Sequence, residues 1–228
     1  MIFRQFEEPQ SNTYTYLVGC ETTRECALID PVASEVSTYL EAIADLGLIL
    51  MYSMDTHVHA DHVTAASRLR DATGCSSVLH ESAGVECADI PVTDGDRILV
   101  GQYEVEVLHT PGHTDACISL RVGDRIFTGD ALLIDGCGRT DFQAGDPARL
   151  YDSIHSKIFS LPEETLVYPG HDYHGRRVSS VGEQKVRNQR LGGNRSKAEF
   201  VALMNNLDLP YPKQIDAALP ANLACGNA

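Results

Sequence analysis

Apolar positions in the first part of the chain switch between the spacing of strands and that of helices. The segments TYTYLV and CALID are typical of short strands, and an Asp-Pro pair ends the second of them. In SEVSTYLEAIADLG, by contrast, Val36, Leu40 and Ile43 recur at helical spacing. Gly47 follows in the position where helices commonly end. We then expect a buried strand in LILMYSM, a helix in HVTAASRLRDATG and a strand in SSVLH.

The middle of the chain predicts two β-hairpins, followed by a helix and a strand. RILV and YEVEVLH flank Gly101-Gln102, while ISLRV and RIFTG flank Gly123-Asp124, and both dipeptides favour tight turns. Asp146-Pro147 places proline at the first position of a helix over ARLYDSIHSKIF. TLVYPGH has the composition of another strand.

The last part of the chain predicts a helical extension that begins at about residue 178. SSVGEQKVRNQRL and SKAEFVALMNNL are helical in pattern, and Ser196 with Glu199 is typical of a capping box. The final segment, LPYPKQIDAALPANLACGNA, carries three prolines and is expected to be an ordered extension. The whole chain, residues 1–228, is long enough for one sizeable core and is expected to form a single domain.

Composition and charge limit the classes of partner. With 43% hydrophobic and 22% charged residues, the chain is typical of a soluble globular protein. Its formal net charge of −14 repels phosphate backbones, which argues against nucleic acid as a partner. Charges at Arg4, Glu7 and Glu8 interrupt the apolar run that a signal peptide needs, and no stretch approaches membrane-spanning length. We therefore expect a cytoplasmic protein with no membrane partner.

Seven cysteines are scattered along the chain without any Cys-x-x-Cys pair. Their odd number and irregular spacing favour reduced thiols over a disulfide framework. Most of them are expected to be small core residues. They are Cys20, Cys26, Cys75, Cys87, Cys117, Cys137 and Cys225.

Four short segments concentrate side chains that bind metals. DTHVHADH, at residues 55–62, holds three histidines and two aspartates, and HTPGH, FTGD and YPGH each end in a further histidine or aspartate. Each segment follows an apolar strand, and a glycine in a tight turn lets the backbone present the next side chain at a sheet edge. No packing requirement gathers such residues, so we expect them to bind one or two divalent ions. The candidate ligands are His57, His59, Asp61, His62, His113, Asp130 and His171.

The remaining histidines lack this setting. His80, His109 and His155 stand outside the four segments and are expected to be ordinary, partly buried residues. His174 lies three residues after His171, so it either orients the metal ligands without binding the metal itself or takes no part in the site.

The motifs THVHADH, TPGH, TGD and PGHDY resemble, in order and spacing, the signature of the metallo-β-lactamase superfamily. The resemblance implies an α/β fold, the αββα sandwich of two packed mixed β-sheets flanked by helices, with a metal site along one edge. The superfamily includes dinuclear zinc hydrolases and mononuclear iron dioxygenases that use the same motif. The number of metal ions therefore stays open at this point.

Two arrangements of the ligands are compatible with the motif. In the first, all seven candidates bind, and a hydroxide between two ions attacks a thioester or lactone. One ion is held by His57, His59 and His113, the second by Asp61, His62 and His171, and Asp130 bridges them. In the second, His57, His113 and Asp130 alone form a triad of two histidines and one carboxylate. Its three open positions suit a non-haem Fe(II) that activates O₂.

The segment GCGRTDFQAGD, residues 136–146, favours the second arrangement. It resembles the persulfide dioxygenase family, in which GRTDFQ is a distinguishing run. Glyoxalase II enzymes have a related loop, but usually bulkier residues where this chain has Val58 and Ala60. The ending FVALMNNLDLPYPKQIDAALPAN also resembles the dioxygenase family. NQRLGGNRS departs from the Asn-Pro-Arg-Leu usual there, which affects only the local shape between the terminal helices.

The resemblance implies a reaction in which glutathione persulfide and O₂ give sulfite and glutathione at one Fe(II) per chain. His57, His113 and Asp130 would be both the iron ligands and the catalytic residues. The other candidates would form an unfilled second site that shapes the first, with a second zinc ion as the alternative. These residues are His59, Asp61, His62 and His171.

Glutathione carries two carboxylates, so an acidic protein needs local positive charge to bind it. Arg139 is the best candidate, because glyoxalase II has a cation at this place in its loop, and Thr140 lies in the same loop. Tyr173 matches the tyrosine that follows the Pro-Gly-His turn of glyoxalase II. Arg176 and Arg177 come next and are either substrate contacts or solvated surface residues.

Two other functions stay open. A hydrolase of the glyoxalase II type, acting on glutathione thioesters, would hold two metal ions and work without O₂. A metal-binding or interaction protein would hold metal without turnover. The oligomeric state is also open, with a homodimer as one option.

Overall fold

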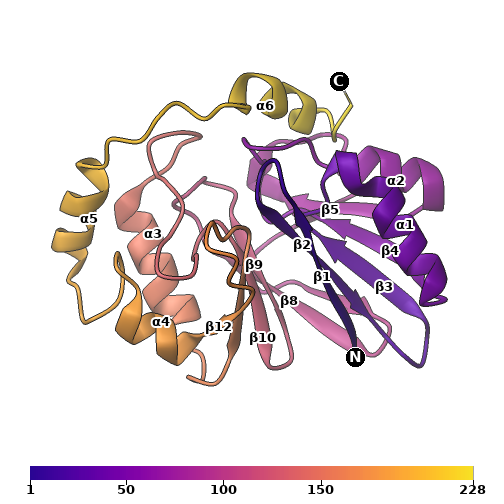
Figure 1. The fold of residues 1–228 in the computed structure, drawn as a ribbon, viewed down its shortest axis with the longest axis horizontal. Coiled ribbons are helices and arrows are strands. Elements are labelled where there is room, and N and C mark those ends of the chain that lie inside the picture. The colour runs from indigo at the N-terminus through magenta and orange to yellow at the C-terminus, as the bar shows by residue number, and fades with distance from the viewer. Residues whose placement is uncertain (228) are drawn as a thin grey trace.

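The computed structural model, which describes residues 1–227, consists of two six-stranded sheets packed face to face between helices (Figure 1). Helices α1 (Val36–Asp45) and α2 (Ala66–Thr73) cover one sheet. The other sheet is covered by α3 (Pro147–Ser153), α4 (Val181–Arg187) and α5 (Lys197–Asn205). Both sheets mix parallel and antiparallel pairs, so the predicted αββα sandwich is confirmed.

The first sheet keeps its strands in chain order. The first three strands pair antiparallel, whereas the third to the sixth are parallel. The carboxyl ends of these parallel strands meet at one edge of the sheet, so the loops that follow them gather there. The strands are β1 (Ile2–Glu8), β2 (Thr13–Gly19), β3 (Glu25–Ile29), β4 (Ile49–Met54), β5 (Ser76–His80) and β6 (Ile90–Val92).

The second sheet has the order β12-β11-β10-β9-β8-β7. Only the pair β10 and β11 is parallel. Both of these strands end at the edge where the loops of the first sheet gather. Two backbone hydrogen bonds join the two sheets there. The Ile118 N–H donates to the Thr56 carbonyl, and the Tyr14 N–H donates to the Gly170 carbonyl. The strands are β7 (Arg97–Val100), β8 (Tyr103–His109), β9 (Ile118–Val122), β10 (Arg125–Gly129), β11 (Leu166–Pro169) and β12 (Ser179–Ser180).

The main hydrophobic core lies between the two sheets. Tyr14, Tyr16 and Phe127 are among its largest fully buried side chains, and the rings of Tyr16 and Phe127 lie 4.9 Å apart. A second apolar cluster, which includes Phe200, lies beneath α3 to α5, and a third, which includes Leu69, lies beneath α1 and α2. This packing fixes the strand ends, and with them the edge of the sandwich.

Several elements differ from the prediction. IFRQFEE forms β1, which the sequence prediction missed because an edge strand tolerates exposed charges that obscure its alternation. Helix α2 begins at Ala66 rather than His62, since the residues before it form an irregular loop. The final segment is ordered, as expected, but it contains helix α6 (Ile215–Leu223) with Pro220 inside it. No helix in residues 1–227 has both the length and the apolar character needed to cross a bilayer.

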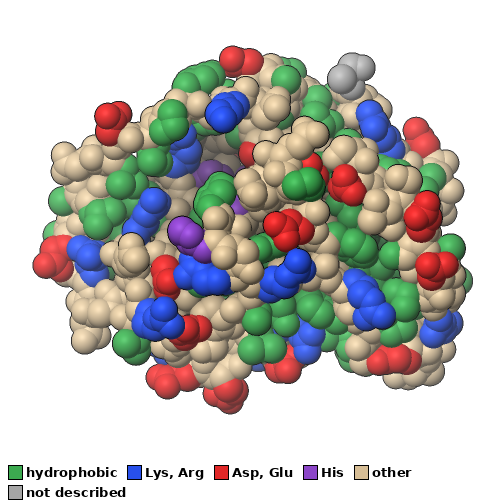
Figure 2. Space-filling view, viewed as in Figure 1, with side chains coloured by type: hydrophobic (Ala, Val, Ile, Leu, Met, Phe, Trp, Pro, Cys, Tyr) green, Lys and Arg blue, Asp and Glu red, His purple; other side chains and the backbone are tan. Residues whose placement is uncertain are grey.

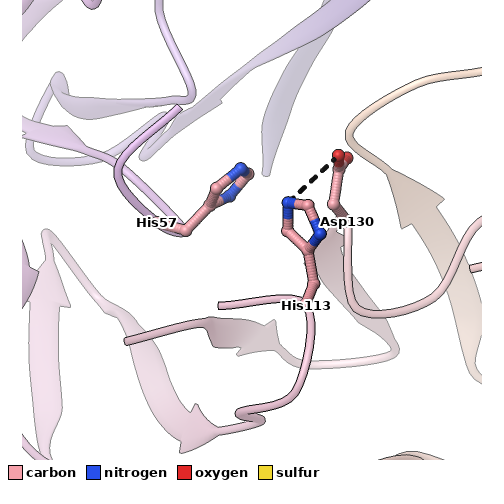
Figure 3. Close-up of side chains that lie close together, drawn as sticks. All are labelled: His57, His113 and Asp130. Carbon is pink, nitrogen blue, oxygen red and sulfur yellow. Dashed lines mark ion pairs between the residues drawn. The ribbon is translucent and has the colours of Figure 1, made fainter. Parts of the chain in front are cut away.

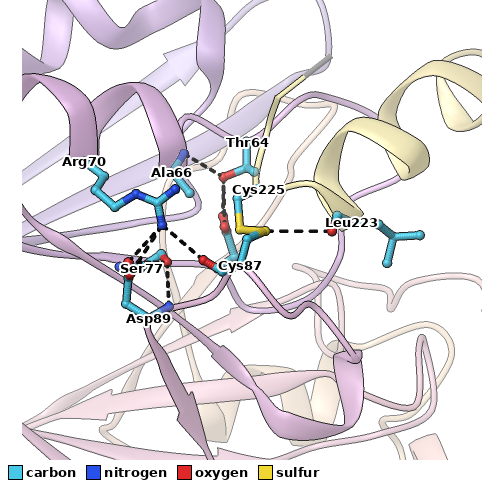
Figure 4. Close-up of a disulfide and its surroundings, with 9 residues drawn as sticks. Thr64, Ala66, Arg70, Ser77, Cys87, Asp89, Leu223 and Cys225 are labelled. Atoms are coloured by element: carbon cyan, nitrogen blue, oxygen red, sulfur yellow. Dashed lines mark hydrogen bonds and ion pairs between the residues drawn. A yellow bond between two sulfur atoms is a disulfide. The ribbon is translucent and has the colours of Figure 1, made fainter.

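The prediction of reduced thiols is wrong for one pair of cysteines. Cys87 and Cys225 form a disulfide that links residues 138 positions apart (Figure 4). Such a pairing depends on where the C-terminal segment packs, which the spacing of cysteines cannot show. The other five cysteines are free and buried, as expected.

Candidate metal centre

Strand ends bring all seven candidate ligands to one edge of the sandwich. The segment with His57 follows β4, and His113, Asp130 and His171 follow β8, β10 and β11. Glycines allow the close approach of these loops. Gly129 has a φ of +48°, and a Cβ there would lie 2.3 Å from the Thr56 hydroxyl.

His57, His113 and Asp130, here called the triad, come together as the sequence predicted (Figure 3). One ligand atom from each lies within 4.8 Å of the others. His113 Nε2 is 3.6 Å from Asp130 Oδ2, and the two imidazole rings are 5.0 Å apart and nearly perpendicular. Both histidines are buried, so water competes poorly for a bound ion.

His59, Asp61 and His62, here called the loop group, form a second cluster within the same 4.8 Å limit. His171 lies beside it, with Nε2 3.4 Å from Asp61 Oδ2 and 3.5 Å from Asp130 Oδ1. Asp130 therefore faces His113 with one oxygen and His171 with the other. The three ligand atoms of the triad lie together without His59. The two-metal arrangement assigns His59 to the same ion as His57 and His113.

Buried polar atoms at this edge fit a metal ion. Among the described residues, His59 Nδ1, His62 Nε2 and Asp130 Oδ1 are buried and have no hydrogen-bond partner. An unpaired buried polar atom costs about 1–3 kcal/mol, which coordination to an ion would remove. Imidazole and carboxylate are ligands that both zinc and iron accept.

Hydrogen bonds to the outer ring nitrogens orient two of the histidines. His113 Nδ1 donates to the Arg139 carbonyl at 2.7 Å, and His171 Nδ1 donates to the Asn12 carbonyl at 3.1 Å. A carbonyl only accepts, so Nδ1 must carry the proton, and in the neutral imidazole Nε2 keeps its lone pair for a metal. Gly138 permits the first contact, because a Cβ there would lie 2.8 Å from His113 Nδ1.

The two clusters differ in charge. Burial, followed by His59 and His113, lowers the pKa of His57 well below its usual value, so this imidazole is neutral and able to bind a metal. His59 is equally buried, but Asp30 and Asp55 outweigh that burial and raise its pKa well above the usual value. His59 Nε2 lies 3.1 Å from Asp30 Oδ1. In the metal-free protein His59 is thus held by carboxylates while His57 is neutral, which favours the triad as the place for the first ion.

A residue that the sequence analysis missed holds the loop between the two clusters. Gln143, the last residue of the GRTDFQ run, donates from Nε2 to the Val58 carbonyl at 2.7 Å. Its φ of 48° places it in the left-handed region, which is uncommon for a residue other than glycine. The run that set this chain apart in sequence therefore contacts the metal-binding motif directly.

A pocket of about 420 Å³ opens beside His171. Tyr173, His174 and Arg176 line it, together with Arg190. Figure 2 shows histidine within a hollow on this face, with Lys and Arg side chains around its rim. None of the triad residues lines this pocket, so a ligand held in it would approach the triad from the side of His171.

The arginines expected to bind substrate are paired with carboxylates. Arg139 makes two hydrogen bonds to Asp141, at 2.6 and 2.7 Å, and neither it nor Thr140 lines the pocket. Arg176 lines the pocket but pairs with Asp172 and another aspartate. Arg177 lies outside the pocket and pairs with a glutamate on β1 at 3.3 Å.

Arg190 is the cation that the sequence analysis missed. Its Nη1 donates to the Cys137 carbonyl at 2.8 Å, and no carboxylate of residues 1–227 forms an ion pair with it. The available signal was the NQRLGGNRS segment, in which Arg190 occupies the arginine position of the usual Asn-Pro-Arg-Leu. That segment had been interpreted as a matter of local shape alone.

Comparison with known proteins places this site in a family. The family model described as Metallo-beta-lactamase superfamily matches residues 9–171. The chain is 48% identical over 229 residues to Persulfide dioxygenase ETHE1, mitochondrial, of Homo sapiens, which covers 99% of this chain and 89% of that protein. It is 38% identical over 170 residues to a hydroxyacylglutathione hydrolase of Rhodospirillum rubrum, covering 72% of this chain and 63% of that protein.

A solved structure agrees with these likenesses. The crystal structure of ETHE1 from Myxococcus xanthus superposes with a TM-score of 0.97 at 54% identity, covering 99% of this chain and 100% of that one. The likeness thus extends from the metal-binding motifs to the C-terminal helices. The chain belongs to the metallo-beta-lactamase superfamily and, within it, to the family of the persulfide dioxygenases.

Proposed function

We propose that this protein is an oxidoreductase, a persulfide dioxygenase that uses O₂ to oxidise glutathione persulfide to sulfite and glutathione. The observation that carries the proposal is the triad of His57, His113 and Asp130, whose ligand atoms lie close enough together to bind one ion without any residue of the loop group. The near full-length likeness to proteins named persulfide dioxygenase supports it. We further propose one Fe(II) per chain, held by the three triad residues.

An Fe(II) ion bound by two imidazoles and one carboxylate supplies open coordination positions for a sulfur ligand and for O₂. The chain's own residues prepare the place for it. The Arg139 carbonyl holds the proton of His113 at Nδ1, and burial keeps His57 uncharged. His171 keeps its proton at Nδ1, so its Nε2 faces the two carboxylates Asp61 and Asp130 and shapes the side from which substrate arrives.

The pocket beside His171 is the proposed site of the glutathione part of the substrate. Arg190 offers hydrogen-bond donors that no carboxylate in residues 1–227 occupies, whereas Arg139 would have to exchange Asp141 for the substrate. Tyr173, whose side chain is 68% exposed, supplies a hydroxyl group that stays protonated at neutral pH, because the ordinary pKa of tyrosine is about 10. Arg139, Thr140, Arg176 and Arg177 stay candidates for the same role.

Oxygen uptake separates this proposal from hydrolysis. Protein purified without air should contain one equivalent of iron, consume O₂ with glutathione persulfide and release sulfite. Two equivalents of zinc, together with thioester hydrolysis under nitrogen, would contradict the proposal.

The second candidate is a thioester hydrolase with two metal ions. It is favoured by the loop group, which lies next to the triad, and by the likeness to a hydroxyacylglutathione hydrolase. The same pair of assays decides between them. A cytoplasmic location and a homodimer stay predictions, and fractionation of cells and light scattering would test them. The mammalian relatives are named as mitochondrial proteins.

A further inference from the structure

The metal-binding motif lies on a loop without regular secondary structure. This ligand loop, residues 55–64, connects β4 to the segment before α2. At its start the Asp55 N–H donates to Val78 and the Thr56 carbonyl accepts from Ile118, but the loop forms no helix and no further strand, so other groups must bind the rest of its backbone. The contacts that hold this loop therefore determine the positions of its histidines and aspartates.

Asn222, on helix α6, binds three backbone groups of this loop at once. Its Oδ1 accepts from the Thr64 N–H at 2.9 Å. Its Nδ2 donates to the carbonyls of His59 and His62, both at 2.8 Å. The side chain is buried, with 5% of its surface exposed. Because an N–H only donates and a carbonyl only accepts, these contacts fix which end of the amide points which way.

The segment around Asn222 packs closely on the ligand loop. The Cys225 carbonyl accepts from the Ser67 N–H at 3.0 Å, at the start of α2. Gly226 has a φ of +83°, and a Cβ there would lie 2.2 Å from the Thr64 carbonyl oxygen. No larger residue fits at this position, since both the backbone angle and the contact exclude it.

The disulfide ties the same segment to the first sheet (Figure 4). Cys87 lies just before β6, and Cys225 lies three residues after Asn222. The end of α6 is thus bound covalently to one part of the sandwich, while its amide holds the ligand loop. Nothing in the proposed reaction requires this segment to touch substrate or metal.

We propose that Asn222 is a positioning residue for the metal centre and that the Cys87–Cys225 disulfide keeps it in place. Asn222 acts through the backbone of His59 and His62, which fixes the turn that follows His57. The inference rests on the proposed metal site, although not on the identity of the substrate. It assigns to α6, the most distant part of the sequence, a role in the geometry of the first ligand motif.

The test measures metal binding as well as turnover. Asn222→Asp keeps the acceptor for Thr64 but replaces the donor that faces two carbonyls with a second oxygen. Removal of a partner that orients a ligand directly typically weakens metal binding about 10- to 100-fold, and because Asn222 acts through the backbone beside His57 we expect a loss at the lower end of that range. We expect that loss in a Co²⁺ titration against a chelator, with an altered Co²⁺ visible spectrum. Turnover should show a lower kcat and an unchanged KM, because the substrate pocket lies on the side of His171.

Matched variants separate positioning from general destabilisation. Asn205→Asp makes the same change at an exposed position at the end of α5 and should leave Co²⁺ affinity unchanged. Asn222→Gln keeps the amide and should restore part of the affinity. Cys87→Ser should weaken Co²⁺ binding in the same direction as Asn222→Asp, but less.

The proposal fails if folded Asn222→Asp protein binds Co²⁺ with the affinity and spectrum of the wild type. If that variant does not fold, hydrogen exchange of the wild type decides. The Thr64 amide should exchange slowly, and exchange at the rate of an open loop would overturn the proposal. A wild type without dioxygenase activity whose Asn222→Asp variant still loses Co²⁺ affinity would refute the proposed reaction and support the positioning role.

Discussion

The triad and the loop group lie side by side but are held in different ways. The triad takes its residues from three segments that follow β4, β8 and β10, so the packing of both sheets sets their separation. The loop group lies on one irregular segment, and its backbone is held by single side chains such as Gln143 and Asn222. His113 and Asp130 are thus placed by the sandwich alone, whereas the loop group depends on a few hydrogen bonds, and His57 shares both supports because it begins the same loop.

The two clusters also differ in how far they satisfy their own charges. In the loop group, Asp61 lies 2.9 Å from His62 Nδ1, and His59 lies 3.1 Å from Asp30. Burial would raise the pKa of Asp61, but His62 and His171 outweigh it and lower that pKa well below the usual value. Asp61 and His59 are therefore paired with neighbouring charges, whereas Asp130 Oδ1 makes no hydrogen bond within residues 1–227 and lies 3.5 Å from His171 Nε2.

The largest effect is expected from Asp130→Ala. This carboxylate faces both clusters, so its loss removes a triad ligand and the contact to His171 together. Iron content and O₂ uptake should both fall to background, because a triad without one member loses affinity as well as geometry. Elemental analysis and an oxygen electrode would measure them. Asp124→Ala, at an exposed hairpin turn, is the control, and retention of iron by Asp130→Ala would show that the metal sits elsewhere.

The next effect concerns the pocket, which opens on the side of the second cluster. Arg190→Ala should lower kcat/KM about 10- to 150-fold, the equivalent of about 1.5–3 kcal/mol for a charge-assisted hydrogen bond. The change should appear mainly in KM, with iron content unaffected. Arg139→Ala should cost less, since its guanidinium is already paired with Asp141. A larger loss for Arg139→Ala would show that the substrate carboxylate binds Arg139, as the sequence predicted, rather than Arg190.

His171→Ala tests directly whether the triad holds the iron without help from His171. We expect most of the iron to remain bound, because the triad is complete without this residue. Activity should fall about 10-fold, the lower end for loss of a residue that orients the ligands. Metal analysis of the purified variant and its kcat would show this. Loss of iron in proportion to activity would mean that the two clusters hold ions together.

The sequence predicted the ligands better than their surroundings. Each ligand segment follows an apolar strand, and strand ends meet at sheet edges, so the convergence of His57, His113 and Asp130 could be expected from local pattern. Contacts between distant segments could not. Asn222 reaches the loop from 158 residues away, and the pairing of Arg139 with Asp141 depends on the shape of an irregular loop.

The smallest effect should appear in the stability of the metal-free protein and has opposite signs at His57 and at His171. The folded pKa of His57 is lowered below 6.5, so at mildly acidic pH the unfolded chain binds a proton that the folded chain does not, and stability rises with pH up to about 6.5. Asp130 and Asp61 outweigh burial and raise the folded pKa of His171 above 6.5. There the folded chain binds the extra proton, so this contribution is complete below pH 6.5 and is lost as the pH rises through the raised value.

Urea unfolding in EDTA at a series of pH values would resolve the two contributions. His57→Gln should flatten the rise below pH 6.5, and His171→Gln should flatten the fall above it. Each slope is limited to about 1.4 kcal/mol per pH unit, the value for one proton. Equal slopes in the two variants would contradict the view that burial dominates at the triad histidine while neighbouring carboxylates dominate at His171. His57 and His171 would then titrate as one coupled pair. An ion bound at the triad would in that case change the protonation of His171.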